Sequence, residues 1–143
     1  MKKELEPVLL QSGLKKTKHR LAVLNILEAS PQPITAEQLF SKLTESGISI
    51  NLSTVYRALE SLSEKNLVIK HNILGNSRAL FEYNRSGHRH YLICLGCKKF
   101  LPLDHCPLEE YEHSVAKETD YTIAGHTLDI YGYCPECSKK DRR

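Results

Sequence analysis

The sequence predicts an α+β protein in two parts, a helical first half that ends in a hairpin and a smaller mixed second half. Apolar residues recur at helical spacing over residues 1–65. Two short runs of strand character follow, at 67–72 and 79–84, around a Gly75-Asn76 turn. The second half carries two C-x2-C pairs. With 143 residues, two small domains at 1–84 and 85–143 are expected, provided that a metal supplements the second core.

Start and stop signals place the helices of the first half. A short helix is expected near the N-terminus, and three longer ones follow it. Their boundaries are Thr17 as the cap of the second helix, Pro31-Gln32-Pro33 as its end, Thr35 with Gln38 as a capping box, Gly47 as the next end, and Asn51 or Ser53 as the last start. Three helices followed by a hairpin is the order of a winged helix-turn-helix.

The fourth helical segment has a polar face that suits DNA. If the apolar residues Val55, Ala58, Leu59 and Leu62 are buried, the outward residues are Ser53, Thr54, Tyr56, Arg57 and Glu60. Hydroxyls at a helix start, then Tyr and Arg, fit phosphate and base-edge contacts in a major groove. The alternative is an ordinary solvated face. Further phosphate contacts are expected from a basic cluster at Lys15, Lys16, Lys18 and Arg20.

The net charge of +3 is unevenly placed along the chain. Residues 1–84 carry 11 Lys or Arg against 8 Asp or Glu, whereas residues 85–143 carry 9 of each. The first half is therefore the part expected to face a polyanion. The start of the chain has no apolar signal-peptide region, and no apolar run is long enough to span a bilayer. We expect a cytoplasmic protein in a reducing environment.

The second half predicts a small α/β unit after a hinge at residues 84–87. Strands are expected at 88–94 and 100–103, a helix from Pro107 to about Glu118, and a long β-type stretch from Tyr121 to Tyr133.

The two C-x2-C pairs, Cys94 with Cys97 and Cys134 with Cys137, predict a structural zinc site. Each tight turn presents two thiolates to one side, and two turns complete the tetrahedral four-sulfur set that zinc prefers. Such a closed site stabilises a fold and does no chemistry. The alternative, two disulfides, does not suit a reducing compartment.

A second set of candidate ligands contains three histidines and a carboxylate. His88 and His90 are two apart, so both imidazoles point to one face of a strand. Glu109 near the next helix start and His126 would complete a site suited to Zn and tolerated by Fe(II) or Mn(II). Each residue taken alone also fits an ordinary surface position.

Several motifs in order resemble the ferric uptake regulator family. They are GLKKTKHR, PITAEQLF, LSTVYRALE, FE at 81–82, HRHYLICLGC and GHTLDIYGYCPEC. The resemblance covers almost the whole chain. It implies a homodimeric transcriptional regulator with an N-terminal winged helix and a C-terminal dimerisation domain. It also implies a structural four-cysteine zinc and one or two further metal sites that control binding to double-stranded DNA.

The resemblance carries over to some metal sites and not to others. The four cysteines match the structural zinc set, and His88, His90, Glu109 and His126 match the regulatory site of the dimerisation domain. The family has another metal site, between the two domains. Its histidines are missing here, because Pro33, Arg89 and Tyr91 stand in their places. Glu82 remains from that site, and His71 is a nearby candidate.

The resulting hypothesis is a zinc-responsive repressor of metal-uptake genes, most like the zinc uptake regulator branch. His105-Cys106-Pro107 and Gly125-His126 favour that branch. Cys106 itself is interpreted as a cysteine at a helix start, and the alternative is a fifth thiolate near a metal. The alternatives are a regulator that responds to ferrous iron or manganese, or a DNA-binding protein with structural zinc only. A zinc hydrolase is disfavoured. No HExxH motif is present, and Pro135 follows Cys134 rather than preceding it as in deaminases.

Overall fold

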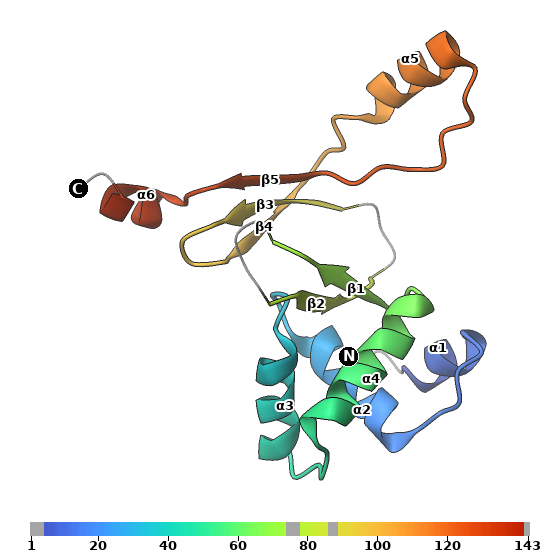
Figure 1. Ribbon diagram of the computed structural model, residues 1–143, viewed down its shortest axis with the longest axis vertical. Coiled ribbons are helices and arrows are strands. Elements are labelled where there is room, and N and C mark those ends of the chain that lie inside the picture. Colours follow the sequence, from blue (N-terminus) through green and yellow to red (C-terminus); the bar gives the residue numbers. More distant parts are fainter. Residues whose placement is uncertain (1–4, 74–77, 86–88, 142–143) are drawn as a thin grey trace. The chain divides into compact units, whose positions relative to one another are not determined.

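Helices α1 to α4 and one hairpin build the first of two units, Met1–Ser86 and Gly87–Arg143, into which the chain divides in this computed structural model (Figure 1). The structure describes residues 5–73, 78–85 and 89–141. The elements of the first unit are α1 (Glu6–Gln11), α2 (Lys18–Ala29), α3 (Ala36–Glu45), α4 (Leu52–Glu64), β1 (Val68–His71) and β2 (Leu80–Tyr83). The expected turn at Gly75-Asn76 lies outside the described residues.

The helix ends follow from their capping residues. The Thr17 side chain accepts a hydrogen bond from the Arg20 amide, and Thr35 and Gln38 form the reciprocal capping box. Asn51, one of the two predicted starts, caps α4 by accepting from the Thr54 amide. After α3, Gly47 has a φ of +81°, a left-handed conformation in which glycine is unstrained.

The hairpin extends the helical bundle into a winged helix-turn-helix. Strands β1 and β2 are antiparallel, with Val68 opposite Tyr83 and His71 opposite Leu80. Ile34, just before α3, exchanges two backbone hydrogen bonds with Phe81, of 3.0 and 2.7 Å. These bonds tie the start of α3 to the hairpin.

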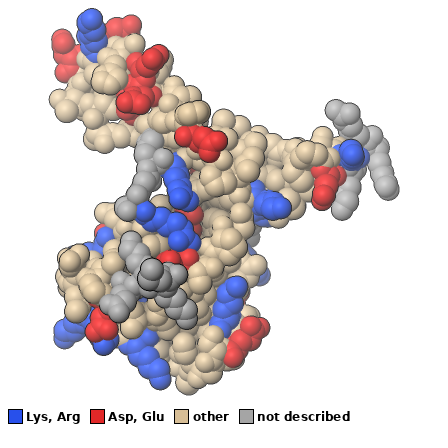
Figure 2. Space-filling model, turned by 180° about the vertical axis from the view of Figure 1, so that it is seen from behind, with Lys and Arg blue, Asp and Glu red and all other residues tan. Residues whose placement is uncertain are grey.

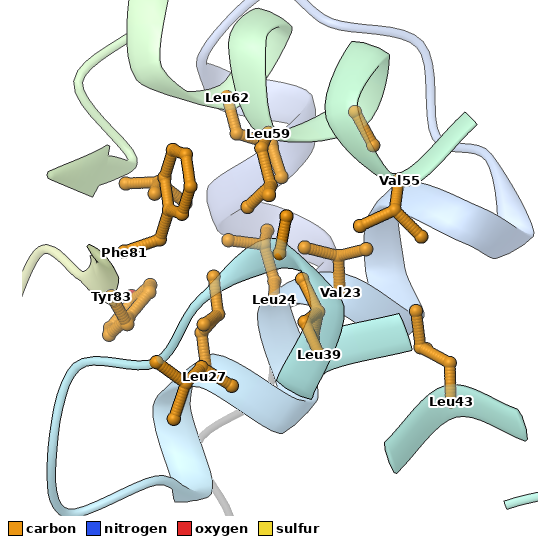
Figure 3. Packing of buried hydrophobic residues seen from close by; sticks show 14 of the residues in the cluster. Val23, Leu24, Leu27, Leu39, Leu43, Val55, Leu59, Leu62, Phe81 and Tyr83 are labelled. Atoms are coloured by element: carbon orange, nitrogen blue, oxygen red, sulfur yellow. The ribbon is translucent and has the colours of Figure 1, made fainter. Parts of the chain in front are cut away.

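One apolar core holds the first unit together. The predicted apolar faces of α2, α3 and α4 meet there, with Phe81 and Tyr83 of β2 at one side (Figure 3). Each fully buried leucine, such as Leu24, Leu39 or Leu59, stabilises the fold by roughly 1.5–3 kcal/mol relative to an exposed one. This core leaves the outward face of α4 free to serve a function.

The second unit is a three-stranded sheet with two helices. Its elements are β3 (His90–Cys94), β4 (Phe100–Leu103), α5 (Glu109–Thr119), β5 (Asp129–Gly132) and α6 (Pro135–Asp141). The strand order is β4-β3-β5, with β4 antiparallel and β5 parallel to the central β3. The buried side chains include Tyr91, Ile93 and Phe100, whereas α5 buries none.

The expected long strand over residues 121–133 is wrong for most of its length. Only Asp129–Gly132 forms a strand, because its pairing with β3 runs from Tyr91 opposite Asp129 to Cys94 opposite Gly132. Residues 120–128 have no regular structure. Helix α6 was not expected. Within the described ranges, no helix has the length and apolar character needed to cross a bilayer.

Candidate metal centres and nucleic-acid face

The four cysteines of the two C-x2-C pairs gather into one cluster, called here the four-cysteine cluster. Cys94 ends β3 and Cys134 follows β5, so the parallel pairing of the two strands brings the two turns together. A hydrogen bond of 2.8 Å from the Leu95 amide to the Gly132 carbonyl fixes this register. The four sulfurs lie within 4.8 Å of one another. The described residues therefore bring the predicted structural zinc ligands into a single set.

The chemistry of the four-cysteine cluster fits a divalent cation. Backbone amides of Cys97 and Cys134 donate to Cys94 Sγ at 3.4 and 3.3 Å, and they lower the pKa of Cys94 to about 6. Side-chain hydrogen bonds raise the pKa of Cys137 to about 12, and the largest contribution comes from the bond with Cys134. One thiolate thus forms readily and the last forms with difficulty. Zn²⁺ would relieve the mutual repulsion of four thiolates.

A second cluster contains His90, Cys106 and His126, and is called here the His–Cys cluster. His90 opens β3, whereas Cys106 and His126 lie in the segments before and after α5. The two Nε2 atoms are 2.9 Å apart, and Cys106 Sγ lies 3.3 Å from that of His90 and 3.4 Å from that of His126. Three atoms of types that ligate metals therefore lie close together. Of the three residues, His90 is buried.

The hydrogen bonds of each imidazole Nδ1 bear on whether the Nε2 atom of that ring presents a lone pair to the cluster. His90 Nδ1 lies 3.2 Å from the carbonyl oxygen of Leu128, and His126 Nδ1 contacts a carboxylate oxygen of Glu112. Both oxygens accept hydrogen bonds, which favours the tautomer with the proton on Nδ1 and with Nε2 directed to the cluster. In that tautomer the two Nε2 atoms, 2.9 Å apart, are placed to bind one cation together. The geometry therefore fits a metal ion.

The predicted regulatory ligands are distributed unevenly. His90 and His126 belong to the His–Cys cluster, and His88 lies outside the described residues. Glu109 lines the same pocket as Cys106 and His126, but the carboxylate that contacts a cluster histidine is that of Glu112. Reasoning from the sequence missed Glu112 and gave metal ligation by Cys106 only as the less favoured alternative. The available signal for Glu112 was its position three residues after Glu109, on the same helix face.

The remaining candidate pair, His71 and Glu82, lies on the hairpin. His71 Nε2 is 2.8 Å from Glu82 Oε1, and both side chains are largely buried. In the ranges that the structure covers, this pair belongs to no group of three metal-ligating side chains. Of the residues that replace the family's histidines, Pro33 is buried and Tyr91 packs edge-on against Phe100, with ring centroids 5.3 Å apart.

The face of α4 that the sequence predicts to contact DNA is exposed. Tyr56 is 45% exposed, and Ser53 and Arg57 are also exposed. Two hydrogen bonds already orient this face. Tyr56 donates its hydroxyl proton to Glu37 Oε1 at 2.8 Å, and Arg57 Nη2 donates to Thr54 Oγ1 at 3.3 Å. The Tyr56 hydroxyl lowers the pKa of Glu37, so the pair stays formed at neutral pH.

The basic cluster before and at the start of α2 is largely exposed, with Arg20 half-buried. Lys15 and Lys16 are at the surface, Lys16 pairs with Glu6 at 2.7 Å, and Arg20 donates to the Lys15 carbonyl at 2.9 Å. Figure 2 shows basic and acidic side chains interspersed over the first unit, while acidic side chains gather on α5.

Comparisons with known proteins agree with this architecture. Residues 11–131 match the Ferric uptake regulator family. The chain is 35% identical over 127 residues to the Ferric uptake regulation protein of Legionella pneumophila, an alignment that covers 88% of this chain and 93% of that protein. The crystal structure of the Vibrio cholerae ferric uptake regulator has a TM-score of 0.76 at 32% identity, over 90% of this chain and 98% of that one. FurB of M. tuberculosis, described as a zinc uptake regulator, has a TM-score of 0.50 at 26% identity, over 90% and 95%. The predicted fold class is confirmed.

Proposed function

Because the chain belongs to the ferric uptake regulator family, we propose that it is a zinc-responsive repressor of metal-uptake genes. Members of this family are metal-responsive, DNA-binding transcriptional regulators and not enzymes. The proposal places the protein in the cytoplasm as a homodimer on double-stranded operator DNA. The observation that carries it is the His–Cys cluster, where the Nε2 atoms of His90 and His126 converge on Cys106 Sγ within 3.4 Å.

The donor atoms favour zinc over the other metals of the family. Imidazole nitrogens suit zinc, and sulfur is a soft ligand that manganese does not prefer. The family's other site cannot supply its usual nitrogens, because Pro33, Arg89 and Tyr91 replace its histidines. The alternative effector is ferrous iron, which the names of curated relatives such as the Legionella protein favour. Of the other two ligands that the sequence predicts, Glu109 is not among the three donors of the His–Cys cluster, and His88 lies outside the described residues.

We assign a different role to the four-cysteine cluster. Four thiolates complete a tetrahedral zinc site and leave no open position, so this zinc would stabilise the second unit. The unit has few buried side chains of its own, none of them on α5. Zinc binding at such sites is coupled to folding and can contribute on the order of 10 kcal/mol.

Metal at the His–Cys cluster would act through the start of β3. His90 is the first residue of that strand and comes five residues after Arg85 in the sequence. Ligation joins this strand start to the segments on both sides of α5. The expected result is a population shift toward the dimer geometry that fits two half-sites. A coupling of roughly 1–3 kcal/mol, or about 5- to 150-fold in DNA affinity, is ordinary for such a switch.

The test is operator binding across a range of buffered free zinc, with Fe(II) and Mn(II) as comparators. We expect wild type to bind more tightly as zinc rises, and His90→Ala to lose that response while it keeps its structural zinc. His113→Ala, an exposed histidine of α5, is the matched control and should respond like wild type. A wild-type response in His90→Ala would contradict the assignment of the sensor. A larger response to Fe(II) than to zinc would favour the iron alternative.

A further inference from the structure

We infer that Cys106, rather than Glu109, is a ligand of the regulatory centre, which is therefore a histidine–thiolate site. The inference deepens the proposed function and rests on it. It assigns three described donors, His90 Nε2, His126 Nε2 and Cys106 Sγ, and gives Glu112 the task of orienting His126.

The separations within the His–Cys cluster match those of ligands that share one zinc ion. With Zn–N near 2.0–2.1 Å and Zn–S near 2.3 Å, tetrahedral ligands place two nitrogens about 3.4 Å apart and a nitrogen and a sulfur about 3.6 Å apart. The structure has 2.9 Å between the nitrogens, and 3.3 and 3.4 Å to the sulfur. All three edges need to lengthen by only a few tenths of an ångström.

The path of the chain places Cys106 beside His90 and His126. It precedes Pro107 and the first turn of α5, and it lies 16 residues from His90 and 20 from His126 in the chain. Its sulfur is nearly equidistant from both Nε2 atoms, at 3.3 and 3.4 Å, as expected of a thiolate that shares one cation with them.

The two acidic residues of α5 divide the remaining tasks. Glu112 accepts from His126 Nδ1, which sets the tautomer that turns the Nε2 lone pair to the metal. Glu109 is exposed and lines the wall of the same pocket with Glu112. The carboxylate is therefore an outer partner of the centre, and sulfur takes the position that the family pattern gives to oxygen. Sulfur in that position selects zinc and disfavours manganese.

Cobalt substitution gives a direct test, because thiolate ligation of Co(II) produces an intense charge-transfer band in the near ultraviolet. Protein that holds about one zinc per chain in the four-cysteine cluster is titrated with Co(II), and zinc retention is checked by metal analysis. We expect the band in wild type and its loss in Cys106→Ser. Glu109→Gln is the matched control and should keep it. Zinc affinity of the second site should fall by at least tenfold in Cys106→Ser and by about 10- to 100-fold in Glu112→Gln.

The outcomes separate this inference from the proposed function. A wild-type spectrum without the band, or a band unchanged in Cys106→Ser with the structural zinc retained, overturns the thiolate ligand. Loss of the cobalt site in Glu109→Gln alone would restore Glu109 as the ligand. Operator binding is measured on the same samples. If the cobalt band depends on Cys106 but zinc does not change DNA affinity, the ligand assignment stands and the regulatory function fails.

Discussion

At the scale of single residues, Gly96 shows how closely the four-cysteine cluster is packed. A Cβ at this position would lie 2.7 Å from Cys137 Sγ and 2.8 Å from Cys137 Cβ, closer than such contacts allow. Cys137 cannot withdraw without removing its sulfur from the cluster. The C-x2-C turn therefore depends on a glycine for steric reasons.

We expect Gly96→Ala to lose most of the structural zinc, about one ion per chain, as Cys97→Ser should. Metal analysis and thermal unfolding of the second unit measure the effect. Gly125→Ala is the control, because a Cβ there meets nothing within 4 Å. Equal zinc content in Gly96→Ala and Gly125→Ala would show that the cluster tolerates the added methyl group.

Glu37 is a positioning residue for Tyr56. The hydrogen bond between them lowers the pKa of Glu37 and raises the pKa of Tyr56. The Glu37 carboxylate therefore ionises at a lower pH than an ordinary glutamate, and the bond weakens as pH falls through this lowered pKa. We expect Glu37→Ala and Tyr56→Phe to reduce the ratio of operator to non-specific binding by similar factors. Binding assays with both DNAs measure this, and independent, additive losses in the double variant would argue against the coupling.

At the scale of elements, local signals predicted the boundaries of the first unit well. The Thr17 cap, the capping box at Thr35 and the cap at Asn51 act within three residues, so the sequence alone contains them. The stretch from Tyr121 to Leu128 has the composition of a strand but forms none. A strand requires a neighbour, and β3 pairs only with the last four residues of the predicted run. That information is not local.

The outward face of α4 should determine operator affinity. Arg57→Ala is expected to cost about 1–3 kcal/mol, with relaxed sequence preference and an unchanged fold, because Arg57 lies off the buried face. Lys15→Ala should instead lower the salt dependence of binding and affect all sequences alike. Titrations with operator and scrambled DNA at several salt concentrations distinguish the two. Unaltered operator affinity in Arg57→Ala would exclude α4 as the reading helix.

At the scale of the whole molecule, the metal centres differ in how far the sequence predicts them. The four cysteines come in two turns, and each turn is complete within four residues, so spacing alone identified the set. The His–Cys cluster draws on three separate segments, and Cys106 joins it only through the path of the chain around α5. Sequence periodicity does not show that these three segments come together, and the family pattern pointed to Glu109 instead.

The same scale carries the prediction that the active protein is a two-fold dimer formed by the second unit. That unit leaves large apolar side chains exposed, among them Leu101 at 57%, Tyr121 at 74% and Ile130 at 45%. Strand β5 lies at the edge of its sheet, and α5 buries none of its residues. Such surfaces and edges are expected to be covered by a second copy, and two winged helices related by a dyad then fit a near-palindromic operator.

We expect zinc-loaded wild type to sediment as a dimer at micromolar concentration, and Ile130→Arg to weaken dimerisation by at least tenfold, or about 1.4 kcal/mol. The charge would sit on the exposed side of β5, where an apolar contact is replaced by a desolvated cation. Leu10→Arg is the matched control, since Leu10 is 55% exposed on the first unit, and it should leave the sedimenting mass of the protein unchanged.

Operator binding should fall with dimerisation in Ile130→Arg, because each half-site alone binds one winged helix weakly. A zinc-loaded monomer of wild type at that concentration would contradict the dimer, and equal effects of both arginines would move the interface away from β5.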